Sequence, residues 1–351
     1  MSLVHIVYVC QKNRQVFSAP MRALREIKRN LVLHERSKLD HQMLKQPRWR
    51  SIFVVVFGHL EKRHGEELRQ LRKGDARLRG VILVEHGASH LKHFVSRERR
   101  SELVDLVLVC SRAQKLIHAA LWPKLSVQRT GLGYSDTLLN PILTREEACD
   151  RYDLNPTQPI VLVAPTWKNN ADWADFFNDL LPQVASVPNH VLSCHVSNKR
   201  NVVMHKGINV AHQGKQPLSS TAYLLPHADV VISDTSSVMF EFLHLKRPII
   251  QLLWRAYPDN PAGPWELPQA LPDNSPFQIG HLYSLGRDTR RLCDVVDEVL
   301  ESPPLQSNLA NLRCVFPNAD QAIARAIVGF VNRRLPKVAK VGHMRIGRNA
   351  R

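Results

Sequence analysis

Short apolar runs alternate along the chain with longer stretches in which apolar side chains recur three or four positions apart. The first pattern is typical of buried strands, and the second is typical of amphipathic helices. In the first 140 residues we predict strands at residues 4–10, 52–57, 81–85, 106–109 and 126–130. We predict helical structure at residues 18–50, 60–79 and 114–121. Strands that alternate with helices in this way predict a parallel, doubly wound sheet.

A second set of alternations begins after residues 140–159, which hold few apolar side chains. Strands are predicted at residues 160–163, 190–196, 208–211, 230–232 and 249–253, and helices at 287–301 and 320–334. Residues 254–285, rich in Pro, Trp and Asn, are predicted to form a long ordered loop. A chain of 351 residues is long for a single core. We therefore predict two α/β domains, residues 1–140 and 141–334, with the last helix returning to the first domain and a basic tail at 335–351.

The stretch 228–250 carries the densest pattern of candidate functional residues. The apolar run Val230–Ile232 ends in the polar segment Asp234–Ser237, and helical spacing resumes at Val238. This order predicts a strand, a polar turn and a helix that begins with hydroxyl groups. Free backbone N–H groups and the dipole at such a helix start favour a phosphate. The alternative is that Ser236 or Ser237 only caps the helix.

Polar residues also follow three other predicted strands. They are His86-Gly87, the segment Thr166–Asn169 and His195. Because ligands of open α/β sheets bind at the carboxyl ends of strands, we expect these groups to converge on one cleft with Asp234–Ser237. The glycine after His86 permits close approach of a ligand, and Lys92 downstream adds a cation. For each lone histidine the alternative is a structural role.

Charge is distributed unevenly along the chain, whose formal net charge is +17. Residues 1–140 hold 26 Lys and Arg against 12 Asp and Glu, whereas residues 141–332 hold 15 against 19. A basic first half and a nearly neutral second half predict different partners for the two halves.

Other features narrow the class of protein. A hydrophobic content of 44% is typical of a globular protein, and no apolar run is long enough to span a bilayer. The N-terminus lacks the charged start of a secretion signal. The six cysteines form no Cys-x-x-Cys pair, which favours buried free thiols in a reducing compartment. No residues have metal-ligand spacing and no Walker-type lysine loop is present, so we expect neither a metal nor a cofactor.

Five segments, in order, resemble motifs of the CDP-glycerol glycerophosphotransferase family, the teichoic acid polymerases and their relatives. They are VEHGASHLK at 84–92, RTGLGYSD at 129–136, VLVAPTWK at 161–168, ADVVISDTSSVMFEF at 228–242 and NADQAIAR at 318–325. The resemblance implies a GT-B fold, in which two Rossmann-like domains face a cleft. Some positions depart from the family pattern. Tyr134-Ser135 stands in place of a Pro-Arg pair, and Thr235, Glu241 and Gln321 replace an aromatic residue, an Asp and a Gly.

The resemblance implies that an acceptor hydroxyl attacks the β-phosphate of CDP-glycerol and that CMP is released. We expect His86 to be the base, because imidazole titrates near neutral pH. Asp234 is expected to orient a hydroxyl or a histidine, with a buried turn cap as the alternative. Hydroxyls at the helix start would meet the diphosphate, and residues 166–169 would anchor the nucleotide. The predicted substrate or donor contacts are Gly87, Lys92, Thr166, Lys168, Asn169, His195, Ser236, Ser237 and Glu241.

Two alternatives are kept beside this hypothesis. One is a GT-B glycosyltransferase that uses a nucleotide sugar in surface polysaccharide synthesis. The other is a non-catalytic basic protein that binds nucleic acid or another polyanion. The sequence leaves open the donor (CDP-glycerol, CDP-ribitol or a nucleotide sugar), the acceptor, the number of units added and the oligomeric state.

The main hypothesis also predicts partners and a place in the cell. The acceptor is expected to be a lipid-linked or polyanionic glycan, and no nucleic acid partner is expected. Nine basic residues lie between Arg22 and Arg50, and seven more follow Asn332. Such clusters favour an anionic lipid surface, so we expect a cytoplasmic protein at the inner face of the cell membrane.

Overall fold

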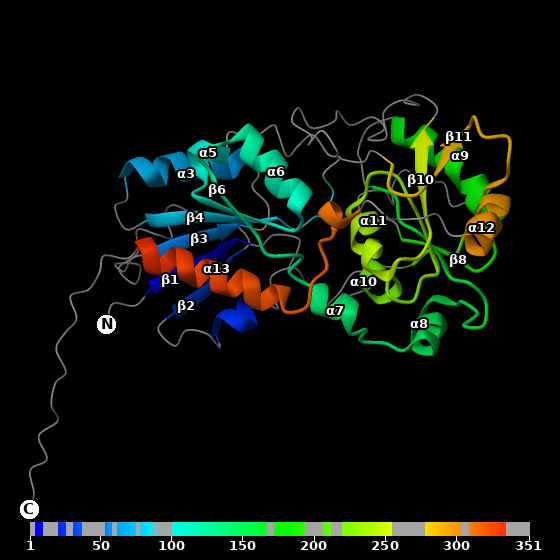
Figure 1. Ribbon diagram of the computed structural model, residues 1–351, viewed down its shortest axis with the longest axis horizontal. Coiled ribbons are helices and arrows are strands. Elements are labelled where there is room, and N and C mark those ends of the chain that lie inside the picture. The colour runs from blue at the N-terminus through cyan, green and yellow to red at the C-terminus, as the bar shows by residue number, and fades with distance from the viewer. Residues whose placement is uncertain are drawn as a thin grey trace, which may run out of the picture.

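The computed structural model describes residues 4–9, 20–25, 31–36, 53–57, 62–74, 78–85, 87, 89, 100–166, 172–193, 206–211, 220–254, 278–302 and 309–334. Figure 1 shows two lobes, each built on one parallel sheet covered by helices. This arrangement confirms the doubly wound α/β architecture that the alternating pattern predicts. Within the described ranges, no helix is both long and apolar enough to cross a membrane.

The first sheet has six parallel strands. They are β1 (Val4–Val9), β2 (Leu31–Arg36), β3 (Phe53–Phe57), β4 (Leu78–Val84), β5 (Leu106–Val109) and β6 (Ser126–Arg129). Their order in the sheet is β2-β1-β3-β4-β5-β6. The central strands β4 and β5 are apolar at consecutive positions because helices cover both of their faces.

Helices from both ends of the chain cover the first sheet. On one face lie α3 (Lys62–Gly74), α5 (Arg100–Leu103) and α6 (Arg112–Leu121). The helical turn at residues 20–25 and α13 (Ala319–Arg334) share a core with the other face (Figure 1). The residues that α13 contributes to that core are Ile323, Ala324, Ala326, Ile327, Phe330 and Val331.

Contacts near Asp105 hold the end of α13 on the first sheet. Gly80 in β4 leaves room for the ring of Phe330, because a Cβ at this glycine would overlap that ring. The Asp105 carboxylate accepts hydrogen bonds from the Val81 N–H at 2.9 Å and from Arg72 at 2.6 Å. Arg334 lies 3.3 Å from the other carboxylate oxygen. The C-terminal helix therefore belongs to the packing of the N-terminal lobe.

The second sheet has five parallel strands. They are β7 (Val161–Val163), β8 (His190–Leu192), β9 (Val230–Ser233), β10 (Ile249–Trp254) and β11 (His281–Leu285). The order is β11-β10-β9-β7-β8, so the chain passes outward from β7 to β8 and then returns to the other side of β7 as β9. Strand order reverses between β7 and β9. Open α/β sheets bind ligands beyond the carboxyl ends of such a strand pair.

Two layers of helices enclose the second sheet. α9 (Asp172–Ala185) and α12 (Leu292–Glu301) supply the core on one face. The other face packs against α8 (Arg145–Tyr152), α10 (Ser220–Leu224) and α11 (Ser237–Phe242), which continues as the 3-10 turn η3 (Leu243–Leu245). This second core also takes in Cys110 and Ala113 from the N-terminal lobe, so the hydrophobic packing is continuous between the lobes. Between them run α7 (Ser135–Leu139) and the short η4 (Ala310–Leu312).

Three secondary-structure predictions are wrong. Residues 18–50 are predicted to be helical, but they include β2, which pairs with β1 along its whole length. Pairing at the sheet edge here outweighs the helix propensity of the surrounding residues. Residues 281–285, predicted as loop, form the edge strand β11, which buries Tyr283 and Leu285. Residues 208–211, predicted as a strand, contribute only the single bridge between Leu192 and Val210.

Arg145 fixes the segment between the lobes to the second sheet. Its guanidinium donates to the carbonyl oxygens of Pro156, Gln158 and His227 and to the Asp229 carboxylate, at 2.7–3.0 Å. Arg145 is the first residue of α8, and this helix begins with a capping box between Thr144 and Glu147.

Replacing Arg145 by methionine is expected to lower the free energy of unfolding by about 2–3 kcal/mol, because four acceptors lose a charged donor in a half-buried place. The matched control is Arg69→Met, which removes one exposed pair with Glu66 and should change stability by less than about 0.5 kcal/mol. Urea unfolding measures both. Equal effects of the two substitutions would contradict this account of Arg145.

Candidate functional site

The carboxyl ends of β7 and β9 are joined by buried polar contacts. The Thr166 N–H donates to Asp234 Oδ1 at 2.8 Å, and the hydroxyls of Thr166 and Thr235 lie 3.5 Å apart. Just before these residues, the Ser233 hydroxyl donates to the Ala164 carbonyl at 2.6 Å. These bonds place two predicted site residues, Thr166 and Asp234, next to each other where the strand order reverses.

The start of α11 carries two half-buried serines. Ser236 occupies the N-cap position with an extended backbone (φ −65°, ψ 149°), yet its side chain makes no capping hydrogen bond. A serine that only capped the helix would accept a bond from an N–H of the first turn. The Ser236 hydroxyl is therefore not used for capping, which favours the ligand hypothesis over the cap alternative.

The end of β4 is held by one side chain of α6. Gln114 Nε2 donates to the Gly87 carbonyl at 2.6 Å, while Gln114 Oε1 accepts from the Cys110 N–H at 2.9 Å. Gln114 is 2% exposed, so it connects the end of β5 to the segment that follows β4 inside the core. This fixes the main chain on the carboxyl side of His86.

A buried pair lies on the other side of the same segment. His118, one helical turn after Gln114, places Nε2 at 3.5 Å from Glu85 Oε1. The Cys110 thiol donates to the Glu85 carbonyl at 3.5 Å. Burial, followed by the carboxylates of Glu85 and Glu241, raises the pKa of the Cys110 thiol well above its usual value. Cys110 thus remains protonated at neutral pH and serves as a donor rather than a nucleophile.

The segment that follows β4 in the first lobe meets the segment that follows β9 in the second lobe. The buried Ser89 hydroxyl donates to the Thr235 carbonyl at 2.8 Å. Gly87 faces Ser237 so closely that a Cβ at position 87 would lie 2.7 Å from Ser237 Oγ. The structure therefore brings together Gly87, Thr166, Asp234 and Ser237 from the predicted site residues.

Glu241 lies on α11 behind this meeting point and is 4% exposed. Its carboxylate accepts a hydrogen bond from Tyr134, and burial together with that carboxylate raises the pKa of the Tyr134 hydroxyl well above its usual value. Tyr134 packs against the cores of both lobes. In this arrangement Glu241 supports the junction, and its contact with a donor hydroxyl stays a prediction.

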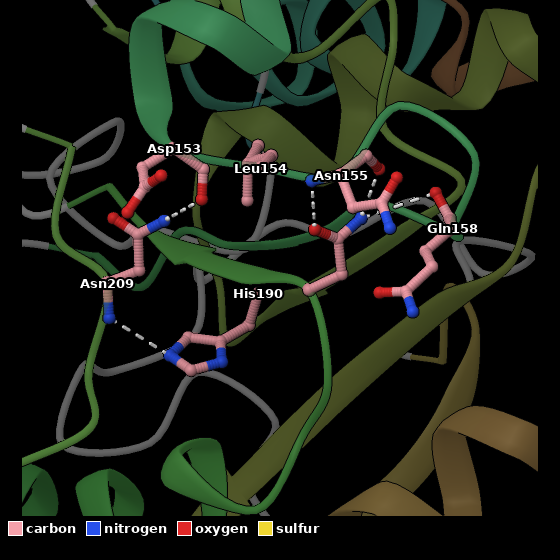
Figure 2. A pocket seen from close by; sticks show the side chains of 7 residues that line it. Asp153, Leu154, Asn155, Gln158, His190 and Asn209 are labelled. Carbon is pink, nitrogen blue, oxygen red and sulfur yellow. Dashed lines mark hydrogen bonds between the residues drawn. The ribbon is translucent and has the colours of Figure 1, made fainter.

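A polar pocket of about 470 Å³ lies at the opposite end of the second sheet (Figure 2). It is formed beside His190, the first residue of β8, by Asp153, Leu154, Asn155, Gln158, Asn189 and Asn209. Asn189 exchanges bonds with the main chain of Asn155, and the Asn209 N–H donates to His190 Nε2 at 3.2 Å. Burial lowers the pKa of His190, which keeps this ring neutral. These amides hold the connection between the lobes in place.

A comparison with known protein families identifies the family of this chain. The sequence profile of the CDP-glycerol:poly(glycerophosphate) glycerophosphotransferase family matches residues 4–263. The chain belongs to this family. It is accordingly a transferase of the glycerophosphotransferase type, as the five motifs indicate.

Solved structures of other proteins are similar in fold to this glycerophosphotransferase. A variant of the wall teichoic acid polymerase TagF has a TM-score of 0.66 at 14% identity, with 95% of this chain and 90% of that chain covered. UDP-GlcNAc 2-epimerase from Neisseria meningitidis, bound to UDP-GlcNAc, has a TM-score of 0.61 at 12% identity, with 93% and 99% covered. These matches confirm the GT-B-like fold. A comparison with curated protein sequences gives no match.

Five of the predicted site residues lie outside the part of the chain that the structure describes. They are His86, Lys92, Lys168, Asn169 and His195. His227 lies away from the site, before β9 at the amino end of the strand, and its carbonyl accepts a hydrogen bond from Arg145. Burial lowers its pKa. Among the described residues, no three His, Cys, Asp or Glu side chains are arranged to hold a metal ion.

Sequence reasoning missed Ser89, Gln114 and Tyr134. Ser89 lies within the motif VEHGASHLK at 84–92, so its place in that motif was the available signal. Tyr134 stands where the family has the Pro-Arg pair, so for this residue the departure from the family pattern was the signal. Gln114 carries no such signal, since a glutamine on a helix is ordinary. Its importance arises only from two bonds made inside the fold.

Substitution of Asp234 separates its structural role from a catalytic one. Asp234→Asn keeps an oxygen to accept the Thr166 N–H and is expected to leave the melting temperature near that of the unsubstituted protein. Asp234→Ala leaves a buried N–H without its partner, which lowers the free energy of unfolding by about 1–3 kcal/mol. Thermal unfolding and turnover are measured on both variants. A large fall in kcat for Asp234→Asn at unchanged melting temperature would show that the charge itself is required.

Proposed function

We propose that this protein transfers a glycerol phosphate, or a related polyol phosphate, from a CDP-linked donor to a hydroxyl of a cell-surface glycan or lipid-linked acceptor. The observation that carries the proposal is the meeting of the Gly87 segment with Ser237, across the lobes and beside the β7–β9 reversal. This meeting brings a segment that contains a histidine against a helix start that bears free hydroxyl and amide donors. A phosphoryl transfer needs both groups at one place.

The reaction proceeds by displacement at the β-phosphorus. The acceptor oxygen forms a new bond to this phosphorus, and the bond from the phosphorus to the oxygen shared with the α-phosphate breaks. CMP leaves with the electron pair of that bond. His86 takes the proton of the attacking hydroxyl, and Gln114 fixes the main chain beside this histidine by binding the Gly87 carbonyl.

Negative charge develops on the phosphate oxygens and on the departing CMP. Ser236 and Ser237 meet this charge together with backbone N–H groups at the start of α11, where the helix dipole also favours an anion. Lys168, Asn169 and Lys92 supply further contacts to the nucleotide and phosphates. Thr166 holds the β7 end in register with Asp234, so the nucleotide-binding segment starts from a fixed point.

A nucleotide-sugar donor is the second candidate, and it is favoured by the fold shared with a UDP-GlcNAc epimerase bound to its sugar nucleotide. Product inhibition distinguishes the two candidates, because the product nucleotide is CMP in one case and UDP or UMP in the other. We expect CMP to inhibit and to raise the melting temperature at lower concentration than UMP or UDP. Preferential inhibition by UDP would favour the glycosyltransferase. A protein that binds only polyanions would respond to none of them at high salt.

We further propose that the first lobe contacts an anionic membrane surface. Arg22 and Arg25 are exposed on the helical turn at 20–25, and each basic residue near an anionic leaflet contributes about 1 kcal/mol. A lipid-linked acceptor would be met by the same surface.

Sedimentation with vesicles tests this surface. Binding is expected with anionic lipid, is expected to weaken as salt rises, and should fall when four basic residues are changed to glutamine: Arg22, Arg25, Lys28 and Arg29. The control changes four basic residues of the second lobe, Lys206, Lys246, Arg287 and Arg313, so that total charge falls equally. Equal binding to zwitterionic vesicles, or equal loss in the control, would contradict the proposal.

A further inference from the structure

A buried hydrogen bond joins the two strand-end segments that face each other between the lobes. The Ser89 hydroxyl donates to the Thr235 carbonyl at 2.8 Å, and the two residues are 146 positions apart in the chain. Ser89 is 3% exposed and Thr235 is fully buried. Water is therefore kept from both ends of this bond, and a carbonyl without the Ser89 donor would lose its partner inside the protein.

Each of the two segments is anchored within its own lobe. On the first side, Gln114 binds the Gly87 carbonyl at 2.6 Å. On the second side, Asp234 binds the Thr166 N–H, and the Thr235 hydroxyl lies beside that of Thr166. The Ser89–Thr235 bond thus connects two segments that are each anchored in their own lobe. It therefore sets the separation between these segments.

A side chain at position 87 would require the Ser237 hydroxyl to move. A Cβ there would lie 2.7 Å from Ser237 Oγ, which is closer than real Cβ contacts, and 3.8 Å from Ser237 Cβ. Glycine at this position allows the main chain that follows His86 to approach the start of α11.

We propose that Ser89 is a positioning residue that holds the two halves of the site at their working separation. It acts through Thr235 on the start of α11, and glycine at position 87 lets the main chain approach without displacing the Ser237 hydroxyl. The contact itself stands on the geometry, whereas its effect on turnover rests on the proposed function. Without the bond, the donor still binds to the second lobe, but the histidine segment and the phosphate are less often at reacting distance.

A cysteine pair tests the contact independently of activity. Gly87→Cys and Ser237→Cys are introduced together with Cys110→Ala, because the Cys110 sulfur lies 3.9 Å from the Gly87 carbonyl and would compete. The Cβ separation of 3.8 Å is that of an ordinary disulfide. We expect a mild oxidant to link the two introduced thiols, and peptide mass spectrometry identifies the linked pair. Free thiols at both positions in folded, oxidised protein would overturn the proposal.

The role of Ser89 is measured in the same background. Ser89→Ala is expected to slow formation of this link by about threefold to tenfold, the effect of one neutral hydrogen bond. The matched control is Ser135→Ala, which removes another buried serine hydroxyl, one that donates to the nearby Leu132 carbonyl at 2.6 Å. Equal slowing by both substitutions would assign Ser89 to general stability and overturn the proposal.

Kinetics with CDP-glycerol complete the test in a chain that keeps its natural Gly87, Cys110 and Ser237. Ser89→Ala should lower kcat by about threefold to tenfold and leave the donor dissociation constant within about twofold, whereas Ser135→Ala should change neither. An unchanged kcat for Ser89→Ala would overturn the positioning role. If the unsubstituted protein does not use CDP-glycerol, the proposed function fails, while the rate of thiol linking still decides whether Ser89 holds the two segments together.

Discussion

Replacing His86 by alanine is expected to lower kcat by about a hundredfold or more, because general-base catalysis contributes about 10²–10⁴ in rate. The affinity for the donor should stay nearly unchanged, since the other proposed donor contacts, most of them in the second lobe, are left in place. The measurements are CMP release under saturating donor and calorimetric titration of the donor. A fall in kcat without a fall in affinity would place His86 at the reacting hydroxyl rather than in the binding surface.

The control for this prediction lies in the same short segment. His90→Ala changes a second histidine of the His-Gly motif and should lower kcat by much less. Unchanged turnover in His86→Ala, or equal losses for the two histidines, would remove His86 from the role of base.

Replacing Ser236 and Ser237 together by alanine is expected to weaken binding of a CDP-linked donor by about a hundredfold or more. Each lost hydrogen bond to a charged phosphate contributes about 1.5–3 kcal/mol, and 1.4 kcal/mol corresponds to a factor of ten. Binding of cytidine, which lacks phosphates, should change by less than about twofold. Calorimetric titration of both ligands gives the ratio of the two effects.

Thr144→Ala is the matched control for the serine pair. Thr144 caps α8 with its side chain and lies in a capping box, so its loss removes a helix cap and nothing at the site. It should lower the melting temperature and leave both affinities unchanged. If the double serine variant behaved in the same way, the serines would be helix caps and the phosphate site would lie elsewhere.

The sequence predicts the segments that form the site better than it predicts how they are joined. Apolar runs that end in small polar residues mark the carboxyl ends of β7 and β9, and parallel strands place such ends at one edge. The interaction of Thr166 with Asp234 follows from this rule. Edge strands were harder to predict: β2 lies among basic residues, and β11 has a short pattern in which only Tyr283 and Leu285 are buried.

The contacts that fix the geometry have no periodic signature. Gln114 and Ser89 bind carbonyl oxygens 27 and 146 positions away, and a carbonyl is present at every residue. Such bonds depend on where the folded backbone passes, and local sequence does not encode that directly. Glu241 illustrates the same limit, because its place on the helix predicts a ligand contact while its burial pairs it with Tyr134.

Product analysis with CDP-glycerol and a hydroxyl acceptor tests directly whether this protein transfers a polyol phosphate. Phosphorus NMR and mass spectrometry are applied to the complete reaction with the unsubstituted protein and with His86→Ala. We expect CMP and a new phosphodiester on the acceptor in equal amounts, formed by the unsubstituted protein and nearly absent with His86→Ala. Intact CDP-glycerol beside consumption of a nucleotide sugar, with a glycosidic bond in the product, would contradict this function.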